Sequence, residues 1–390
     1  MRNEYLPFSP PAIGPEEIAE VVQTLRSGWL TTGPKTREFE MCFAAYFGSQ
    51  SALALNSCTA GLHTALVALG IGPGDEVITT CLTFAASVNV IEHVGARPIL
   101  VDVQPDTLNI DPAGVERAIT PRTKAILPVH FAGHPVDLDA ILALAEHRKL
   151  PVLEDAAHAV GAKYRDRWIG SGASLAAFSF YATKIMTTGV GGLLVGVEEL
   201  IARSRIISLH GMSHEAWRRY ERGGSWQYDV VLPGFKYNMT DIAAALGLCQ
   251  LRRLAEFQRR RREIADAYTR AFSELDEIET PSTRPDVVHA WHLYVIRLRP
   301  GRLTIGRDQF INELTNRNIG TSVHFIPIHL HPFYRNKYRY NENDFPVAYD
   351  SYTRMLSLPL NPSMNDEDVA DVIRAVCDIV EGSRYSRRAA

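Results

Sequence analysis

The chain has 390 residues, of which 46% are hydrophobic and 22% are charged, and its formal net charge is -3. This length allows a large core in about two domains, whereas the small net charge excludes a bulk field that would attract nucleic acid or a membrane. Five cysteines without a CxxC pair, no signal-peptide pattern and no apolar run of membrane-spanning length favour a reduced, cytoplasmic protein.

The N-terminal part is predicted to form two helices, over residues 14–25 and 35–47, because a proline and two acids open the first of them. The loop between them contains glycines, a proline and threonines. Loops often carry binding residues, so Trp29 and Thr31 are candidate substrate contacts. The alternative is that Trp29 only anchors the loop.

A strand, a turn of small residues and a helix follow. We expect the strand at 51–55, the turn from Asn56 to Gly61 and the helix at 62–69. This geometry presents backbone N–H groups and a positive helix end to a phosphate, although small residues also allow tight packing. The glycine-rich stretch 70–74 is a turn, because it follows a helix and precedes a strand, which reverses the order of a dinucleotide-binding motif.

The next region alternates strands with helices. Near-continuous apolar strands are predicted at 76–80, 97–102, 124–130, 151–155 and 178–184. Such alternation is typical of an α/β fold, in which helices cover both faces of a mainly parallel sheet. Ligands of these sheets bind at the carboxyl ends of the strands, and both Asp155 and Lys184 follow such ends.

A lysine and an aspartate at the ends of two buried strands are what pyridoxal phosphate requires. The cofactor's aldehyde needs an amine for a Schiff base, and its ring nitrogen needs an anion to stay protonated. Each residue alone has an ordinary alternative: Asp155 as a helix cap or ion-pair partner, and Lys184 as a solvated side chain.

The C-terminal half is predicted to be smaller and mixed. The polar stretch 210–233 is a candidate mobile or partner-contacting loop. Thr240 or Asp241 is expected to cap a long helix, on which the run from Arg259 to Arg262 forms a solvated face. We expect this helix to link a large cofactor-binding domain, residues 1–245, to a small α+β domain, residues 246–390.

Three histidines lie close together near the end of a strand predicted at 321–325: His324, His329 and His331. Neither cysteines nor a carboxylate cluster accompany them, so contacts to a polar substrate, or simple packing, are favoured over a zinc site. We therefore predict no metal.

Several segments, in content and order, resemble one known family. They are SGWLTTGPKTREFE, NSCTAGLHTAL, GDEVITTCLTF, EDAAHA, FSFYATKIMTTGVGG, GFKYNMTDIAAALGLCQL and HFIPIHLHPFY. The chain resembles the DegT/StrS-type sugar-nucleotide aminotransferases, which are pyridoxal phosphate enzymes of fold type I. Within the family it looks most similar to enzymes that aminate a 4-keto sugar on a nucleotide, such as the enzyme that makes 4-amino-4-deoxy-arabinose for lipid A. The dehydratase branch has histidine in place of the lysine.

The resemblance implies a role for each matching residue. Lys184 matches the Schiff-base lysine, and Asp155 matches the acid that pairs with the pyridinium nitrogen. His158 matches a position beside the phenolic oxygen, and Phe84 an aromatic that stacks on the ring. The remaining matches contact the phosphate: Thr59, Ala60 and Ser179.

Asn238 matches a phosphate contact from the neighbouring subunit, which implies a homodimer with shared active sites. Many relatives place this asparagine two residues earlier, where the chain has Lys236, so either residue is a candidate. The candidate substrate contacts are Trp29, Thr31, His324 and His329.

The resemblance thus implies a pyridoxal phosphate-dependent aminotransferase that moves an amino group from glutamate to a keto group, at C4, of a nucleotide-linked deoxy sugar. A C3 keto sugar or a non-sugar ring ketone is an alternative substrate of the same chemistry. A non-catalytic regulator that kept the fold is an alternative from another class.

Overall fold

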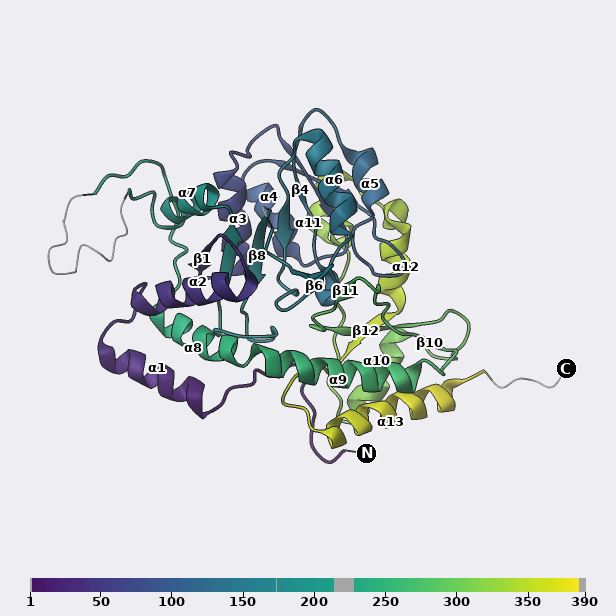
Figure 1. Cartoon of the computed structure of the whole chain (residues 1–390). Helices are drawn as coiled ribbons and strands as arrows, with labels where there is room; N and C mark the ends of the chain where they lie inside the picture. Colours follow the sequence, from purple (N-terminus) through teal and green to yellow (C-terminus); the bar gives the residue numbers. More distant parts are fainter. Residues whose placement is uncertain (1, 173, 214–227, 386–390) are drawn as a thin grey trace.

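The computed structural model describes residues 2–172, 174–213 and 228–385, and its centre is a twisted sheet (Figure 1). A four-stranded sheet of order β1-β9-β8-β5 and a three-stranded sheet of order β3-β2-β4 meet through parallel bridges from β4 and its extension to β5. Only β9 runs against its neighbours, so the predicted mainly parallel α/β fold is confirmed. The strands are β1 (Ser51–Leu55), β2 (Glu76–Thr80), β3 (Arg97–Val101), β4 (Thr123–Leu127), β5 (Leu153–Asp155), β8 (Leu175–Ser179) and β9 (Gly192–Gly196).

Helices cover both faces of this sheet because successive side chains of each strand point to opposite sides. In β8, Phe178 belongs to an apolar cluster that includes residues of α2, α5, α6 and α8, whereas Ala177 belongs to one that includes residues of α3, α4 and α7. The helices are α2 (Pro34–Phe47), α3 (Cys58–Ala68), α4 (Ala85–His93), α5 (Pro112–Ala118), α6 (Leu138–Arg148), α7 (Glu198–Ser208) and α8 (Asp241–Arg252).

Two helix starts depend on side-chain caps. Helix α3 begins at Cys58, four residues before the predicted start, because the Ser57 hydroxyl accepts a hydrogen bond from the backbone N–H of Ala60. Thr240 caps α8 in the same way. The buried carboxylate of Asp241 instead accepts from the backbone N–H groups of Gly33 and Thr36 and fixes the entry to α2.

The C-terminal part has its own core. The predicted long helix is broken at Arg253 into α8 and α9, which run end to end below the sheet (Figure 1). Helices α9, α10 and α13 pack against an antiparallel sheet of order β10-β12-β13. These elements are α9 (Leu254–Phe272), β10 (Ile278–Glu279), β12 (Tyr294–Leu298), α10 (Arg307–Asn316), β13 (Met355–Leu358) and α13 (Asp366–Ser383). The remaining described α-helices and strands are α1 (Pro15–Ser27), β6 (Lys163–Tyr164), β7 (Arg167–Trp168), β11 (Val287–Val288), α11 (Pro332–Tyr338) and α12 (Pro346–Arg354).

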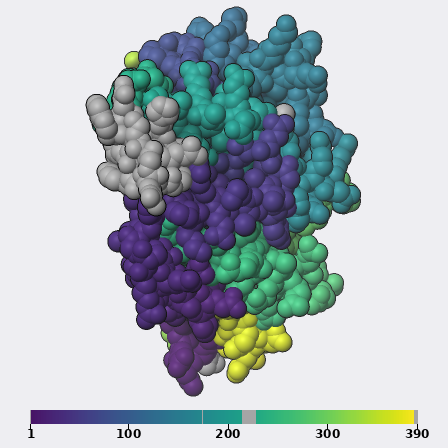
Figure 2. Space-filling view, turned by 60° about the vertical axis from the view of Figure 1, so that its left-hand side comes forward, coloured from purple at the N-terminus to yellow at the C-terminus, as the bar shows by residue number. Residues whose placement is uncertain are grey.

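The beginning of the chain lies against this C-terminal part. Leu6 forms a parallel bridge with Ile319 and belongs to the same apolar cluster, and Arg2 forms an ion pair with Asp368 at 2.7 Å. The space-filling view shows the N-terminal residues (purple) reaching down to α13 (yellow) (Figure 2).

The prediction that the arginine run on α9 forms a solvated face is wrong for Arg261. Its side chain is buried, with 1% of its surface exposed, and Nη1 donates hydrogen bonds to the carbonyl oxygens of Trp291, His292 and Leu360. A charged group is tolerated in a core only when such partners replace water. Arg259 is largely exposed, as predicted.

The predicted loop 210–233 falls partly outside the described residues. Its described ends run antiparallel, with bridges from Leu209 to Lys236 and from Met212 to Val230. Among the described helices, none combines the length and the apolarity that crossing a membrane requires.

Candidate active site

A pocket of about 350 Å³ opens at the carboxyl ends of β5 and β8. The two strands are parallel neighbours, with Asp155 paired to Ala177, so the last residue of β5 lies two residues before the end of β8. Asp155 and Lys184 therefore face the same cavity, as expected for ligand sites of parallel sheets. The structure brings these two candidate residues together.

Asp155 is a buried carboxylate, with 5% of its surface exposed. Its Oδ2 accepts a hydrogen bond from the Ser87 hydroxyl at 2.7 Å, and its Oδ1 accepts one from the Ala157 backbone N–H at 3.1 Å. Burial raises the pKa of Asp155, while these hydrogen bonds and the positive charge of Lys184 oppose the rise. A cation bound in the pocket would favour the ionised carboxylate further.

Lys184 stands in the turn after β8, where its backbone N–H bonds to the carbonyl oxygen of Tyr181 at 2.9 Å. Burial of the amine lowers its pKa to about 8, although the acidic groups of Asp155 and Cys58 oppose this shift. A substantial fraction of the amine is therefore neutral near physiological pH. A neutral amine can act as a nucleophile or as a proton acceptor, which an ordinary surface lysine cannot do at that pH.

The other end of the pocket is shaped to receive an anion. Thr59, in the first turn of α3, and Ser179, at the end of β8, both line it, and the positive end of the helix dipole points toward this turn. The Ala60 N–H is already bonded to the cap hydroxyl of Ser57 at 3.0 Å. Gly192 passes so close that a Cβ there would lie 2.2 Å from the Ser57 carbonyl carbon, so only glycine fits this position.

Two buried histidines, His158 and His292, the partly buried His324 and the ring of Phe325 form a wall of the pocket. The rings of His158 and His292 lie 4.3 Å apart, and Phe325 stacks on His158. Burial lowers the pKa of all three histidines, and that of His324 to about 4, so their rings are neutral at physiological pH. The Nδ1 atoms of His158 and His292 are buried without a hydrogen-bond partner among the described residues. Such atoms are available to a bound ligand.

The predicted ring contact Phe84 lines the mouth of the pocket and is 62% exposed. His324 also lines the pocket, and its Nδ1 lies 2.8 Å from the hydroxyl of Ser357. His329 lies outside it: the side chain is fully buried, and its Nε2 is 3.2 Å from the carbonyl oxygen of Glu342.

The remaining candidates gather in a separate cluster that does not line the pocket. Trp29 donates from its indole nitrogen to the carbonyl oxygen of Thr32 at 3.2 Å, which fits the anchoring alternative. The Thr31 carbonyl oxygen accepts from the backbone N–H of Asp241. Asn238 donates to the Thr32 hydroxyl at 2.6 Å. The loop between α1 and α2 and the approach to α8 thus form one surface.

Two residues that contact the acid–amine pair were not predicted as site residues. Ser87, which bonds to Asp155, lies on α4, and no sequence spacing links the two. His292 lies two residues before the start of β12, and its Nε2 lies 3.4 Å from the Nζ of Lys184. The sequence does contain a signal for His292 that was not used: it is a polar residue that interrupts an apolar run.

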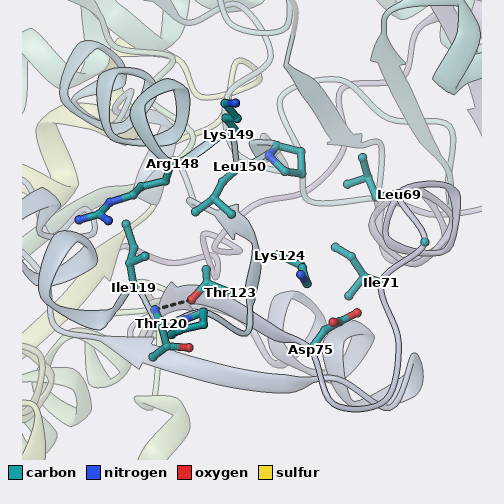
Figure 3. Close-up of a pocket in the computed structure, with 13 residues that line it drawn as sticks. Leu69, Ile71, Asp75, Ile119, Thr120, Thr123, Lys124, Arg148, Lys149 and Leu150 are labelled. Carbon is teal, nitrogen blue, oxygen red and sulfur yellow. Dashed lines mark hydrogen bonds between the residues drawn. The ribbon is translucent and has the colours of Figure 1, made fainter.

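A second, open hollow of about 750 Å³ lies at the other edge of the sheet, beside Thr123 at the start of β4 (Figure 3). Its charged lining residues are Asp75, Lys124, Arg148 and Lys149. Parallel sheets bind ligands at the opposite ends of their strands, and the described residues that line this hollow include no buried acid–amine pair. In the described part of the chain, no three metal-binding side chains come together.

Comparisons with known proteins agree with this geometry. A model of the DegT/DnrJ/EryC1/StrS aminotransferase family matches residues 11–377. Spore coat polysaccharide biosynthesis protein SpsC of Bacillus subtilis is 55% identical over 384 residues, which cover 98% of this chain and 99% of that protein.

Solved structures are similar over nearly the whole chain. The PLP-form of the putative sugar aminotransferase Spr1654 from Streptococcus pneumoniae is 38% identical with a TM-score of 0.90, covering 97% of this chain and 99% of that one. Helicobacter pylori PseC, an aminotransferase involved in the biosynthesis of pseudoaminic acid, is 28% identical with a TM-score of 0.89, covering 97% and 100%.

Proposed function

The chain belongs to the DegT/DnrJ/EryC1/StrS aminotransferase family, and from this premise we propose that it moves an amino group from glutamate to the C4 keto group of a nucleotide-linked deoxy sugar. It is an enzyme that uses pyridoxal phosphate. The observation that carries the proposal is the shared pocket of Lys184, a lysine with a lowered pKa, and Asp155, a buried carboxylate.

The residues of the pocket fit this cofactor. Lys184 would hold its aldehyde, and Asp155 its ring nitrogen. The first turn of α3 and Ser179 would hold its phosphate. When bound, the cofactor supplies a carbonyl that carries the amino group and a ring that accepts electrons. The unpartnered Nδ1 of His158 offers the hydrogen-bonding group that the phenolic oxygen needs.

The chain's own contribution is to hold charge and to move a proton. Lys184 takes the α-proton from the amino donor while its amine is neutral. In the second half of the exchange the same amine gives a proton to the acceptor carbon. A positioned acid–base group of this kind typically contributes about 10²–10⁴-fold to the rate. Asp155 keeps a negative charge at the floor of the pocket, where Ser87 fixes the orientation of its carboxylate.

Two features support a sugar as the amino acceptor. SpsC, at 55% identity, is named for spore coat polysaccharide biosynthesis, which needs sugar building blocks. The wall of neutral histidines and one phenylalanine offers a polar group at His324 beside the apolar ring of Phe325, and such a surface suits a deoxy sugar that has both hydroxyl and methyl groups.

We also propose a homodimer, in which Asn238 of one subunit contacts the phosphate held by the other. Large apolar side chains are exposed at the mouth of the pocket, where Phe84 is 62%, Tyr181 52% and Val190 61% exposed. Exposed apolar groups beside a binding site commonly mark an interface. All five cysteines are free, which supports a cytoplasmic location.

The test is a panel of nucleotide-linked 4-keto and 3-keto sugars, each incubated with glutamate, with the products identified by NMR. We expect amination at C4, and Lys184→Ala should abolish it while Lys149→Ala, at an exposed lysine, leaves it intact. Amination at C3 or of a non-sugar ketone alone would replace the proposed substrate. Normal turnover by Lys184→Ala would refute the catalytic assignment.

A further inference from the structure

We propose that His292 is the positioning residue of Lys184: its Nε2 holds the lysine amine in the pocket whenever that amine is not covalently engaged. The inference rests on the proposed function, because it assigns a partner to the amine that carries out the chemistry. The two nitrogen atoms lie 3.4 Å apart, and among the described residues no other side chain forms a hydrogen bond with Nζ of Lys184. Catalytic hydrogen bonds are often this long before a ligand binds.

The main chain around His292 is held from two sides. From the C-terminal part, the buried Arg261 donates from Nη1 to the carbonyl oxygens of Trp291 and His292, at 3.2 and 3.4 Å. From the short 3-10 turn that follows β4, the carbonyl oxygen of Ala132 accepts the backbone N–H of His292 at 3.0 Å. The loop is thus fixed and the imidazole is buried beside the ring of His158, whereas the lysine has a flexible chain of four carbons, so the imidazole determines where the amine rests.

The ring also has the chemistry to serve both forms of the amine. Burial lowers the pKa of His292 well below its ordinary value, and the neighbouring His158 and the positive charge of Lys184 lower it further. A neutral imidazole can present either a lone pair or an N–H at Nε2, depending on its tautomer. Because Nδ1 has no partner, Nε2 is the only hydrogen-bonding atom of the ring that the described residues satisfy. Nε2 can therefore accept from an ammonium or donate to a free amine.

Asp155 does not make this contact in the structure. Its two oxygen atoms accept hydrogen bonds from the Ser87 hydroxyl and the Ala157 N–H, and it acts on Lys184 through charge, without a hydrogen bond to Nζ among the described contacts. Asp155 thus favours the protonated amine at a distance. His292 fixes its direction. Because a misplacement of about 1 Å can cost about 10²-fold in rate, direction matters as much as charge.

The test measures covalent capture of pyridoxal phosphate by the full-length apoprotein, followed by borohydride reduction and mass mapping of Lys184. His292→Phe should slow capture about tenfold or more, because the amine loses its direction. His292→Gln, which places an amide near the position of Nε2, should recover most of the rate. The affinity for pyridoxamine phosphate, which has no aldehyde and forms no bond to lysine, should stay within about threefold for both variants, because the phosphate and ring contacts remain.

His289→Phe is the matched control. His289 is also buried on this loop, stacks on Trp291 at 3.9 Å and accepts the Trp291 backbone N–H at 2.8 Å, but it does not line the pocket. Its variant should capture pyridoxal phosphate at a rate close to wild type.

Three results would overturn the proposal. They are an unchanged rate in His292→Phe, an equal slowing in His289→Phe, and an equal loss of pyridoxamine phosphate affinity in His292→Phe. The last two would assign His292 a purely structural role. A separate result bears on the proposed function: if Lys184→Ala still captured the aldehyde at the wild-type rate, the lysine assignment itself would fail, whatever the His292 variants do.

Discussion

The lowered pKa of Lys184 predicts how its reactivity depends on pH. The amine has a pKa of about 8, compared with 10.5 for an ordinary lysine. At pH 7, about 10% of the amine is neutral in the folded protein, against about 0.03% of a free lysine side chain. Lys184 should therefore react with an aldehyde on the order of 300-fold faster at pH 7 than an exposed lysine of equal intrinsic nucleophilicity.

The direction of the pKa shift of Lys184 follows from two opposing influences. Burial favours the neutral amine and lowers the pKa, while the negative charge of Asp155 favours the ammonium and raises it. Capture of pyridoxal phosphate should rise about tenfold per pH unit up to about pH 8 and then level off. Asp155→Asn removes the raising influence, so the midpoint should move to lower pH. The titratable groups facing the amine are Asp155, Cys58, His158, His292 and His324.

The assay is stopped-flow capture of pyridoxal phosphate by the apoprotein between pH 6 and 10, with the attachment site verified at Lys184. Because the cofactor also titrates, the rate for N-acetyl-lysine amide is measured in parallel and the ratio is analysed. Glu154→Gln is the matched control, since this buried carboxylate lies on the same strand but pairs with His130 at 2.9 Å. The reasoning would be refuted if the ratio of the two rates showed no change of slope near pH 8, or if Asp155→Asn moved the midpoint of the pH dependence to higher pH.

Three further variants test other parts of the structure. Ser87→Ala removes a hydrogen bond that lowers the pKa of Asp155, so the acid limb of the pH–rate profile should shift to higher pH; an unchanged limb would argue against this coupling. Asn238→Ala should raise the dissociation constant of pyridoxamine phosphate about tenfold, corresponding to one charge-assisted hydrogen bond, whereas the same loss in Lys236→Ala alone would reverse the assignment. Arg261→Met should reduce the free energy of unfolding, measured in urea, by roughly 1–3 kcal/mol because buried carbonyl groups lose their donor; no change would show that these bonds contribute nothing net.

The large sheet could be predicted because its signals are local. The strands are runs of mostly apolar residues, β5 ends at Asp155 and β8 at Ser179, and strand ends in a parallel sheet share an edge, so Asp155 and Lys184 could be assigned to one place. The start of α3 was wrong because small residues are compatible with both a turn and a helix. The cap at Ser57 decides between them, and its hydrogen bond is visible only in the structure.

Arg261 shows a different kind of error. A run of four arginines indicates a solvated surface by composition, but the helix period gives another answer. Phe257, Arg261, Ile264 and Tyr268 follow one another at spacings of four, three and four residues and share the buried stripe of α9. The helix period therefore allowed the burial of Arg261 to be predicted from the sequence. The carbonyl groups that accept its hydrogen bonds could not be predicted, because they belong to residues 30 to 99 positions further along the chain.

The same long-range contacts explain why the acid–amine pair could be predicted and the wall around it could not. The pair depends on two adjacent strands, whereas the wall depends on how the C-terminal part packs against the large sheet. Arg261 holds the loop that carries His292 to the amine, and His324 and Phe325 complete the wall from the same part of the chain. Substitutions that reshape His324 or Phe325 should therefore change which sugar is accepted without impairing capture of the cofactor. Substitutions at His292 or Arg261 should impair capture itself, because those residues act through Lys184.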